Sequence, residues 1–122
     1  MGIQAKRVYD PPDPQDGTRV LVDRVWPRGL SKEQVQADRW LKSAAPSTAL
    51  RKWFNHEPTK WEEFKRRYFS ELDDQPEAVG ELLAAASQGR LTLLFSARET
   101  EHNQAVALKE YLLSPARGNG CC

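Results

Sequence analysis

Seven polar or aromatic residues that could hold a small anion follow two short apolar runs of the sequence. The runs are VLV (20–22) and LTLLF (91–95), and each is typical of a buried strand. The residues that follow them are Asp23, Arg24, Trp26, Arg28, Ser96, Arg98 and His102. Arginine binds phosphate and carboxylate through paired N–H donors, and ligands of open α/β sheets bind where buried strands end. The sequence therefore predicts a binding pocket for a phosphate or carboxylate group.

The types of these residues predict a division of roles within the pocket. The expected roles are orientation for Asp23 and Arg24, anion binding for Arg28 and Arg98, stacking for Trp26, and lining of the floor for Ser96 and His102. The loop from 96 to 103 leads into a helix, whose free N–H groups also favour an anion. If the two strands are parallel neighbours, their ends lie about 5 Å apart. Ser96 beside His102 also offers a nucleophile and a base, so the sequence leaves open whether the protein is an enzyme and uses a cofactor.

Two other interpretations of the charged residues compete with an anion pocket. In the first, Asp23 and the arginines form a structural salt-bridge network between the strand ends. The acidic stretch 99–101 is a separate argument against a phosphate site, because it would repel a phosphate if it turned inward. In the second, histidines and carboxylates hold a metal ion, although they lack the usual helical spacing of ligands. The residues of this second set are His56, Glu57, Glu101 and His102.

A non-catalytic module that binds nucleic acid or another protein is the remaining alternative. Trp26 and the arginines on either side of it would form the contacts, helped by the basic run Lys65–Arg67. The chain has 18 Lys and Arg against 17 Asp and Glu, which excludes a basic field over the whole domain. Nucleic acid is therefore not the favoured partner, and the sequence leaves the oligomeric state open.

Apolar spacing and helix-start signals predict one α/β domain over residues 1–114. Strands are expected at 3–9, 18–25, 37–43 and 91–95, and helices are expected to begin near 31, 47, 58, 76, and 100 or 103. Because no helix separates the first two strands, we expect them to pair antiparallel or to lie apart in a mixed sheet. The prediction is a compact layered domain in which a small mixed, mostly parallel sheet is flanked by helices.

The two ends of the sequence predict a cytoplasmic protein with a disordered tail. The first ten residues lack the apolar core of a secretory signal, and no apolar run approaches the roughly 20 residues needed to cross a bilayer. Cys121 and Cys122 are adjacent and cannot staple the fold, so a reducing compartment is expected. Residues 115–122 are expected to be disordered, as chain ends usually are.

Three long blocks of the sequence resemble one protein family. They are VYDPPDPQDGTRVLVDRVWPRGLSK (8–32), WLKSAAPSTALRKWFNHEPTKWEEFKRRY (40–68) and LTLLFSARETEHNQAVALKEYL (91–112). In this order, over roughly 3–113, the chain is similar to the YeaO-like branch of the domain-of-unknown-function 488 (DUF488) family. The resemblance implies a compact α/β domain, and it implies little about function because the family takes its name from having none assigned.

Two motifs of the wider family resemble segments of this chain. The first is D-V-R-x-x-P-x-S-R, whose places are matched by Asp23, Arg24, Pro27 and Arg28. The second is a Cys-Ala-Glu at the end of the last strand with a Cys-His-Arg at the next helix start, where this chain has SAR (96–98) and HN (102–103). Because both cysteines are missing, the resemblance implies no thiol chemistry here. The shared aspartate, arginines and histidine favour one pocket at the strand ends.

Overall fold

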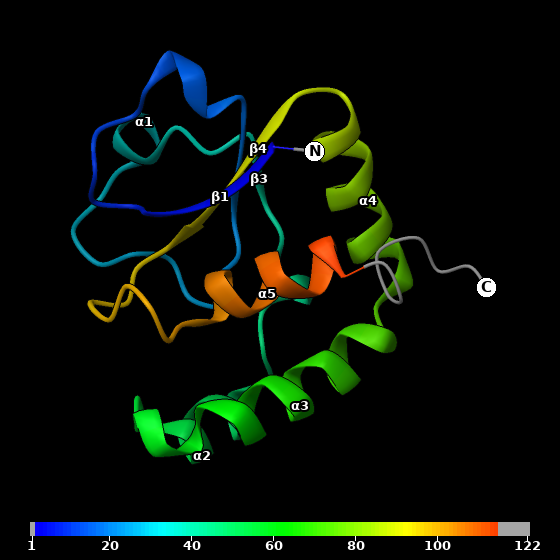
Figure 1. Ribbon diagram of the computed structural model, residues 1–122. Helices are drawn as coiled ribbons and strands as arrows, with labels where there is room; N and C mark the ends of the chain where they lie inside the picture. The colour runs from blue at the N-terminus through cyan, green and yellow to red at the C-terminus, as the bar shows by residue number, and fades with distance from the viewer. Residues whose placement is uncertain (1, 115–122) are drawn as a thin grey trace.

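Four parallel strands form a single sheet in the computed structural model, which describes residues 2–114 (Figure 1). The sheet order is β1-β4-β2-β3. The strands are β1 (Gly2–Arg7), β2 (Thr18–Leu21), β3 (Arg39–Trp40) and β4 (Arg90–Phe95). The helices are α1 (Lys32–Val35), α2 (Thr48–Phe54), α3 (Trp61–Asp73), α4 (Pro76–Ser87) and α5 (Gln104–Leu113). This arrangement confirms the predicted α/β fold class. The predicted tail and its two cysteines lie outside the described residues.

The first two strands do not pair, because β4 lies between them and is parallel to both. Of the two predicted arrangements, the antiparallel pair is wrong and the separation of the two strands is confirmed. The sheet is not mixed, because no antiparallel strand is present among residues 2–114. The chain between β1 and β2 returns to the other end of the sheet through a proline-rich loop and a 3-10 turn (Pro14–Asp16). This connection does the work of a crossover helix, which is the usual way of joining parallel strands.

The two faces of the sheet have different covers. Ile3, Val20 and Leu93 belong to the main core, which the sheet shares with α2, α3, α4 and α5. Leu21 and Leu94 point to the other face, where they pack with Val35 of α1 in a smaller cluster. The alternation along β2 and β4 follows from the two-residue period of a strand. Figure 1 shows α4 on one side of the sheet and α1 on the other.

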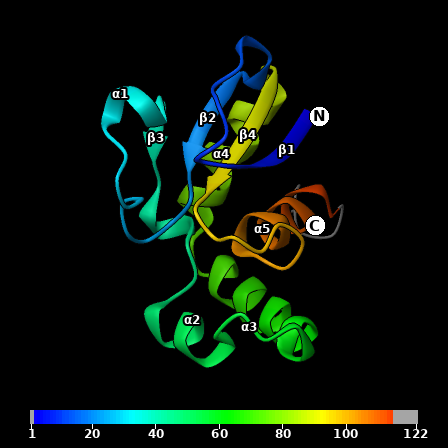
Figure 2. The same ribbon diagram turned by 90° about the vertical axis from the view of Figure 1, so that its left-hand side faces the viewer.

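Helices α2 and α3 form a layer beyond the end of the sheet, with α5 between α3 and the strands (Figures 1 and 2). The predicted spacing of Trp61, Phe64, Tyr68 and Leu72 is the buried stripe of α3. Tyr68 is fully buried, and its hydroxyl donates a hydrogen bond to the carbonyl oxygen of Ala44. This contact fixes α3 against the segment that leads into α2.

Several element boundaries differ from the prediction. The first two strands were expected over 3–9 and 18–25, but β1 ends at Arg7 and β2 ends at Leu21. The third strand was expected over 37–43, but β3 has two residues and a 3-10 turn (Lys42–Ala44) follows it. The last helix begins after Asn103, whose side chain accepts a hydrogen bond from the N–H of Val106 at 3.0 Å. Of the two predicted starts, 103 is confirmed and 100 is wrong, because Asn103 is the residue that caps the first turn. Within residues 2–114, no helix is both long enough and apolar enough to cross a membrane.

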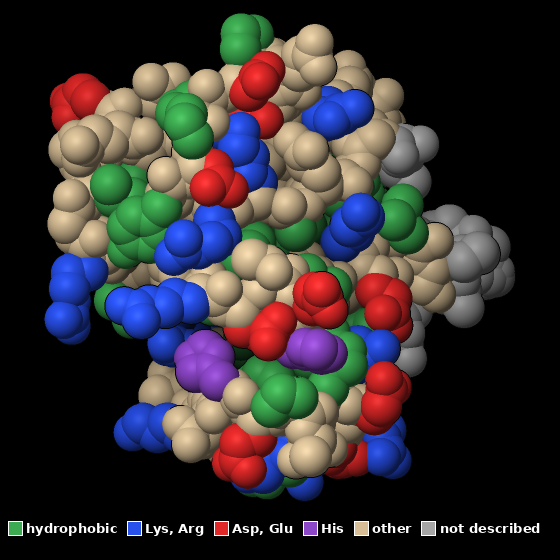
Figure 3. Space-filling view, turned by 60° about the vertical axis from the view of Figure 1, so that its left-hand side comes forward, with side chains coloured by type: hydrophobic (Ala, Val, Ile, Leu, Met, Phe, Trp, Pro, Cys, Tyr) green, Lys and Arg blue, Asp and Glu red, His purple; other side chains and the backbone are tan. Residues whose placement is uncertain are grey.

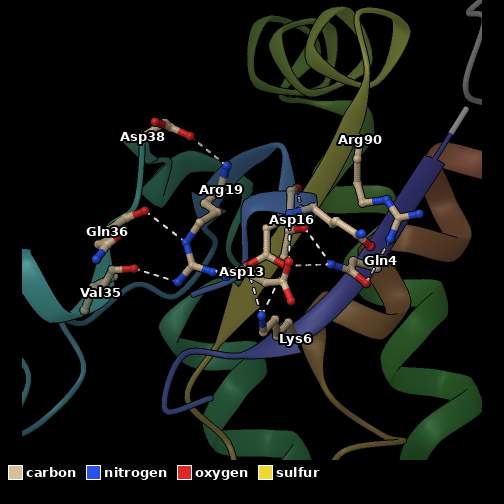
Figure 4. A network of polar contacts seen from close by, with 11 residues as sticks. Gln4, Lys6, Asp13, Asp16, Arg19, Val35, Gln36, Asp38 and Arg90 are labelled. Atoms are coloured by element: carbon tan, nitrogen blue, oxygen red, sulfur yellow. Dashed lines mark hydrogen bonds and ion pairs between the residues drawn. The ribbon is translucent and has the colours of Figure 1, made fainter. Parts of the chain in front are cut away.

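A buried network of charges lies on the α1 face of the sheet (Figure 4). Asp16, 2% exposed, accepts hydrogen bonds from Lys6 at 2.9 Å and from the buried Arg19. Arg19 donates to the carbonyl oxygens of Val35 at 2.7 Å and Gln36 at 3.0 Å. The network therefore joins β1, β2, the loop between them and the end of α1.

Candidate functional site

A cavity of about 550 Å³ lies where β2 and β4 end. Its walls are formed by residues within 23–28, 45–56 and 96–104, together with Tyr9 and Phe64. Leu21 of β2 is in register with Leu94 of β4, so the loops after these parallel strands leave the sheet side by side. Helix α2 closes the cavity from the opposite side. The neighbouring, parallel strand ends that the sequence predicted are thus confirmed.

Six of the seven residues predicted for the pocket line this cavity. They are Asp23, Arg24, Trp26, Arg28, Ser96 and His102. The seventh, Arg98, is exposed and is not among the described residues that line the cavity. The acidic stretch beside it does not face the cavity either, because the carboxylate of Glu99 accepts hydrogen bonds from the N–H groups of Glu101 at 2.7 Å and His102 at 3.1 Å. These bonds hold the pKa of Glu99 below its usual value.

Asp23 is a buried carboxylate on the wall of the cavity. Its Oδ2 accepts a hydrogen bond from the N–H of Ser96 at 3.0 Å, and its Oδ1 accepts one from the side-chain amide of Gln104. The backbone of Asp23 is held as well, since Trp40 Nε1 donates to its carbonyl oxygen at 2.7 Å. Asp23 therefore ties the end of β2 to the end of β4 and the start of α5.

Burial raises the pKa of Asp23 above its ordinary value, and the hydrogen bonds from Ser96 and the charge of Arg51 offset only part of this. A raised pKa means that the folded protein holds the Asp23 proton more tightly than the unfolded chain does. The ionised carboxylate then lowers stability above the folded pKa, and this cost disappears as the pH falls below the unfolded value.

Asp23→Asn is consequently expected to keep or raise the free energy of unfolding at neutral pH. The asparagine oxygen can still accept from Ser96, and the Gln104 amide can rotate to accept from the new amide group. Urea unfolding at about pH 7 and about pH 3.5 measures this, and the difference between variant and wild type should shrink at the lower pH. A variant that is less stable by the same amount at both values would contradict the expectation.

Arg24 spans the gap between the sheet and the segment before α2. Its Nε donates to the carbonyl oxygen of Pro46 at 3.0 Å, and its Nη2 donates to that of Ala45 at 3.2 Å. Within the described part of the chain, Asp23, Arg24 and Arg28 form no ion pair. The alternative of a salt-bridge network at the strand ends is therefore wrong for these residues.

Helix α2 and the two residues after it add a polar stripe that the sequence analysis missed. The stripe consists of Thr48, Arg51, Lys52, Asn55 and His56, and all five line the cavity. Thr48, Arg51 and Lys52 lie on one face of α2, opposite Leu50 and Phe54 in the core, and Asn55 and His56 directly follow the end of the helix. The polar residues Thr48, Arg51 and Lys52 recur at helical spacing in the sequence, but the prediction of this helix rested on its cap and its apolar residues.

Trp26, which was predicted to stack on a ligand, makes contacts with other residues of the chain. Trp26 Nε1 donates to the carbonyl oxygen of Leu30 at 2.7 Å, and its ring meets that of Trp40 edge to face at 5.3 Å. The predicted basic run of α3 is also occupied, since Lys65, Arg66 and Arg67 all form ion pairs with glutamates. Both features therefore make contacts within the chain itself.

The two histidines lie on the same face of the molecule, with Lys and Arg side chains beside them (Figure 3). Both His56 and His102 line the cavity, whereas Glu57 and Glu101 do not. Among residues 2–114, no group of three or more His, Cys, Asp or Glu side chains is placed to hold a metal ion. The four residues proposed for a metal site do not form a ligand set.

Comparison with known proteins gives the family of the chain. The family model described as "Inactive DUF488-N3 subclade" matches residues 2–119. The uncharacterized protein YeaO of Escherichia coli is 44% identical over 114 residues, which cover 93% of this chain and 99% of the relative. The uncharacterized proteins Mb3100c of Mycobacterium bovis and Rv3073c of Mycobacterium tuberculosis are each 38% identical, over 90% of this chain and 92% of theirs. No solved structure gives a significant match. The chain belongs to the DUF488 family, as its resemblance to the YeaO-like branch predicted, and the matching model is that of the inactive N3 subclade.

Proposed function

We propose that the cavity at the ends of β2 and β4 binds a small phosphate- or carboxylate-bearing ligand. One observation carries this proposal. Four basic side chains line the cavity, namely Arg24, Arg28, Arg51 and Lys52. Among residues 2–114, none of the four is in an ion pair, and Asp23 is the only carboxylate on the walls.

Positive charges that line one cavity without a carboxylate partner favour an anion there. The guanidinium groups of Arg28 and Arg51 can each give two parallel hydrogen bonds to a phosphate or carboxylate, and charge-assisted bonds of this kind are the strong ones in proteins. Arg24 already donates from Nε and Nη2 to backbone carbonyl oxygens, so it adds its charge and its remaining N–H groups. The first turn of α5 reaches the same cavity through Asn103 and Gln104, and the start of a ten-residue helix adds a partial positive charge. The basic residues come from two directions, the loop after β2 and helix α2, so an anion would be held between sheet and helix.

The size and walls of the cavity favour a ligand larger than a bare ion. Its volume of about 550 Å³ lies within the range of ordinary small-molecule sites, about 300–1,000 Å³. Pro46, Phe54 and Phe64 supply apolar wall opposite the charged loops. A ligand with an anionic group and an organic body would use both kinds of surface.

The family comparison favours binding over catalysis. The matching subclade carries the printed description "inactive". Ser96 and His102 both line the cavity, but it is the backbone N–H of Ser96 that contacts Asp23, and His102 Nδ1 lies 3.4 Å from Glu99. A Ser–His pair hydrogen-bonded for nucleophilic attack is not present among the described contacts, so the proposal is a binding role.

The test is a titration of the whole protein with inorganic phosphate, followed by thermal melting and calorimetry. Phosphate at about 100 times its dissociation constant should stabilise the fold by about 2.7 kcal/mol. Arg51→Met should weaken binding at least about tenfold, because one charge-assisted hydrogen bond contributes about 1.5–3 kcal/mol. Arg51 is exposed on α2, so this change should leave the melting temperature without ligand nearly unchanged.

Arg90→Met is the matched control, because Arg90 is exposed at the first residue of β4. Ser96, where this strand reaches the cavity, is six positions further along the chain, which is about 20 Å. Equal weakening in both variants would mean that phosphate responds to net charge alone and would count against the pocket. A titration with a single-stranded oligonucleotide tests the accessory-module alternative. If that alternative holds, the oligonucleotide binds in a salt-dependent manner and inorganic phosphate does not bind.

A further inference from the structure

We infer that the cavity selects anions that carry a proton of their own, so that hydrogen phosphate binds and sulfate is rejected. The inference rests on the proposed anion-binding function and names the class of ligand for that same site. It comes from the one feature that a simple anion pocket would lack, which is a buried carboxylate on the wall among the cations.

The carboxylate of Asp23 cannot turn away from the cavity. Its Oδ2 is held by the N–H of Ser96 at 3.0 Å, a backbone group that has no freedom to rotate. Its Oδ1 is held by Gln104, and Trp40 fixes the carbonyl oxygen of the same residue at 2.7 Å. An ionised carboxylate has about four acceptor positions and no donor, so acceptor positions remain beyond those used by the protein.

The cations on the walls do not neutralise this carboxylate directly. Among residues 2–114, no Arg or Lys nitrogen lies within 4.0 Å of the Asp23 oxygens. An oxygen of the ligand that approaches Asp23 must therefore bring a hydrogen with it, or two acceptors face each other unpaired. Hydrogen phosphate and phosphate monoester monoanions carry such an O–H group, and an O–H···O⁻ bond is short and strong.

Sulfate provides the contrast, since it has nearly the same shape and charge but no proton near neutral pH. A site built to hydrogen-bond a hydroxyl group rejects an analogue that lacks it, because its buried partner is left unpaired. We expect sulfate to bind at least about 100-fold more weakly than hydrogen phosphate. Arg28, Arg51 and Lys52 alone would not make this distinction, because cations attract both anions equally.

The experiment is calorimetric titration of the full chain with inorganic phosphate, sulfate and monofluorophosphate at about pH 8, where all three are dianions and only phosphate keeps a proton. Wild type should prefer phosphate over both of the others by at least about 100-fold. Asp23→Asn should bring the three affinities within about fivefold of one another, because an asparagine amide can donate to an unprotonated oxygen. Glu77→Gln, an equal charge change at an exposed residue of α4, should keep the wild-type preference.

The outcomes separate this inference from the function on which it rests. Phosphate and sulfate binding equally to wild type, with both weakened in Arg51→Met, would overturn the selection and leave an anion site. A preference for phosphate that survives in Asp23→Asn would remove Asp23 as its cause and overturn the inference. No binding of any of the three anions would remove both proposals. The comparison of three anions on wild type needs no variant, so it decides the inference even if Asp23→Asn does not fold.

Discussion

Asp16→Asn is expected to lower the free energy of unfolding by about 3–5 kcal/mol, because it leaves buried positive charges without a counter-charge. Asp16 is 2% exposed and receives hydrogen bonds from Lys6, Arg19 and Gln4 (Figure 4). Arg19 is itself buried, and its other donors are committed to the carbonyl oxygens of Val35 and Gln36. Asparagine keeps the shape of the side chain but loses the charge, so the guanidinium of Arg19 cannot find a substitute.

The same carboxylate predicts how this difference depends on pH. Burial alone would raise the pKa of Asp16, but the hydrogen bonds from Lys6, the Asp13 N–H and Arg19 hold it below the usual value. Its stabilisation is therefore complete above the unfolded pKa of 3.8 and is lost as the pH falls through the folded value. The pKa of Asp16 is thus lowered and that of Asp23 is raised, so the two carboxylates change stability with pH in opposite directions, although both are buried.

Urea unfolding of wild type and Asp16→Asn, from neutral pH downwards, measures both the size and the sign. The two curves should converge at the acid end. Glu63→Gln is the control, since Glu63 forms ion pairs with Arg66 and Arg67 on the exposed surface of α3. It should change stability little, as exposed pairs usually do. An effect of Asp16→Asn no larger than that of the control would show that the network does not stabilise the fold.

The position of the pocket was predictable from the sequence, but the charged network was not. Asp23 and Ser96 stand where unbroken apolar runs stop, and a buried strand must end where its polar residues begin. Asp16 carries no such signal, since in DPPDPQDG it looks like an ordinary turn residue. Lys6 and Thr92 contact it from two different strands, and Val35 holds its partner Arg19 in place. Only the tertiary fold brings them together.

The strand order was also beyond local reasoning. A ten-residue loop rich in proline lies between β1 and β2, and such loops usually join antiparallel neighbours. The loop instead crosses a face of the sheet, because Val8 packs against Leu21 and Leu94 and its N–H donates to the carbonyl oxygen of Phe95 at 2.7 Å. Val8 and Asp16, near the two ends of the loop, are both buried, so the loop packs on this face while β4 lies between β1 and β2. The sequence pattern predicts each strand but not that β1 and β2 both pair with β4.

Gly17→Ala is expected to destabilise the protein by at least about 3 kcal/mol, because the position lacks both the space and the backbone geometry for a side chain. A Cβ at residue 17 would lie 2.2 Å from the carbonyl oxygen of Arg90, which is part of the β4 backbone and cannot move aside. Gly17 also has φ 67° and ψ −132°, a conformation that residues with a side chain rarely adopt. The close approach lets the loop set Asp16 on the sheet, where Thr92 donates to the Asp16 carbonyl oxygen at 2.7 Å.

Gly80→Ala provides the opposite result on the same chain. Gly80 is exposed within α4, and a Cβ there would meet no atom within 4 Å. Alanine should therefore raise stability by about 0.5–1 kcal/mol through its higher helix propensity. Thermal and urea unfolding of both variants compare a glycine that the fold requires with one that it only tolerates. If Gly17→Ala had the same melting temperature as Gly80→Ala, the loop before β2 would have to lie farther from β4 than the contact between residues 17 and 90 places it. The buried position of Asp16 would be lost with that contact.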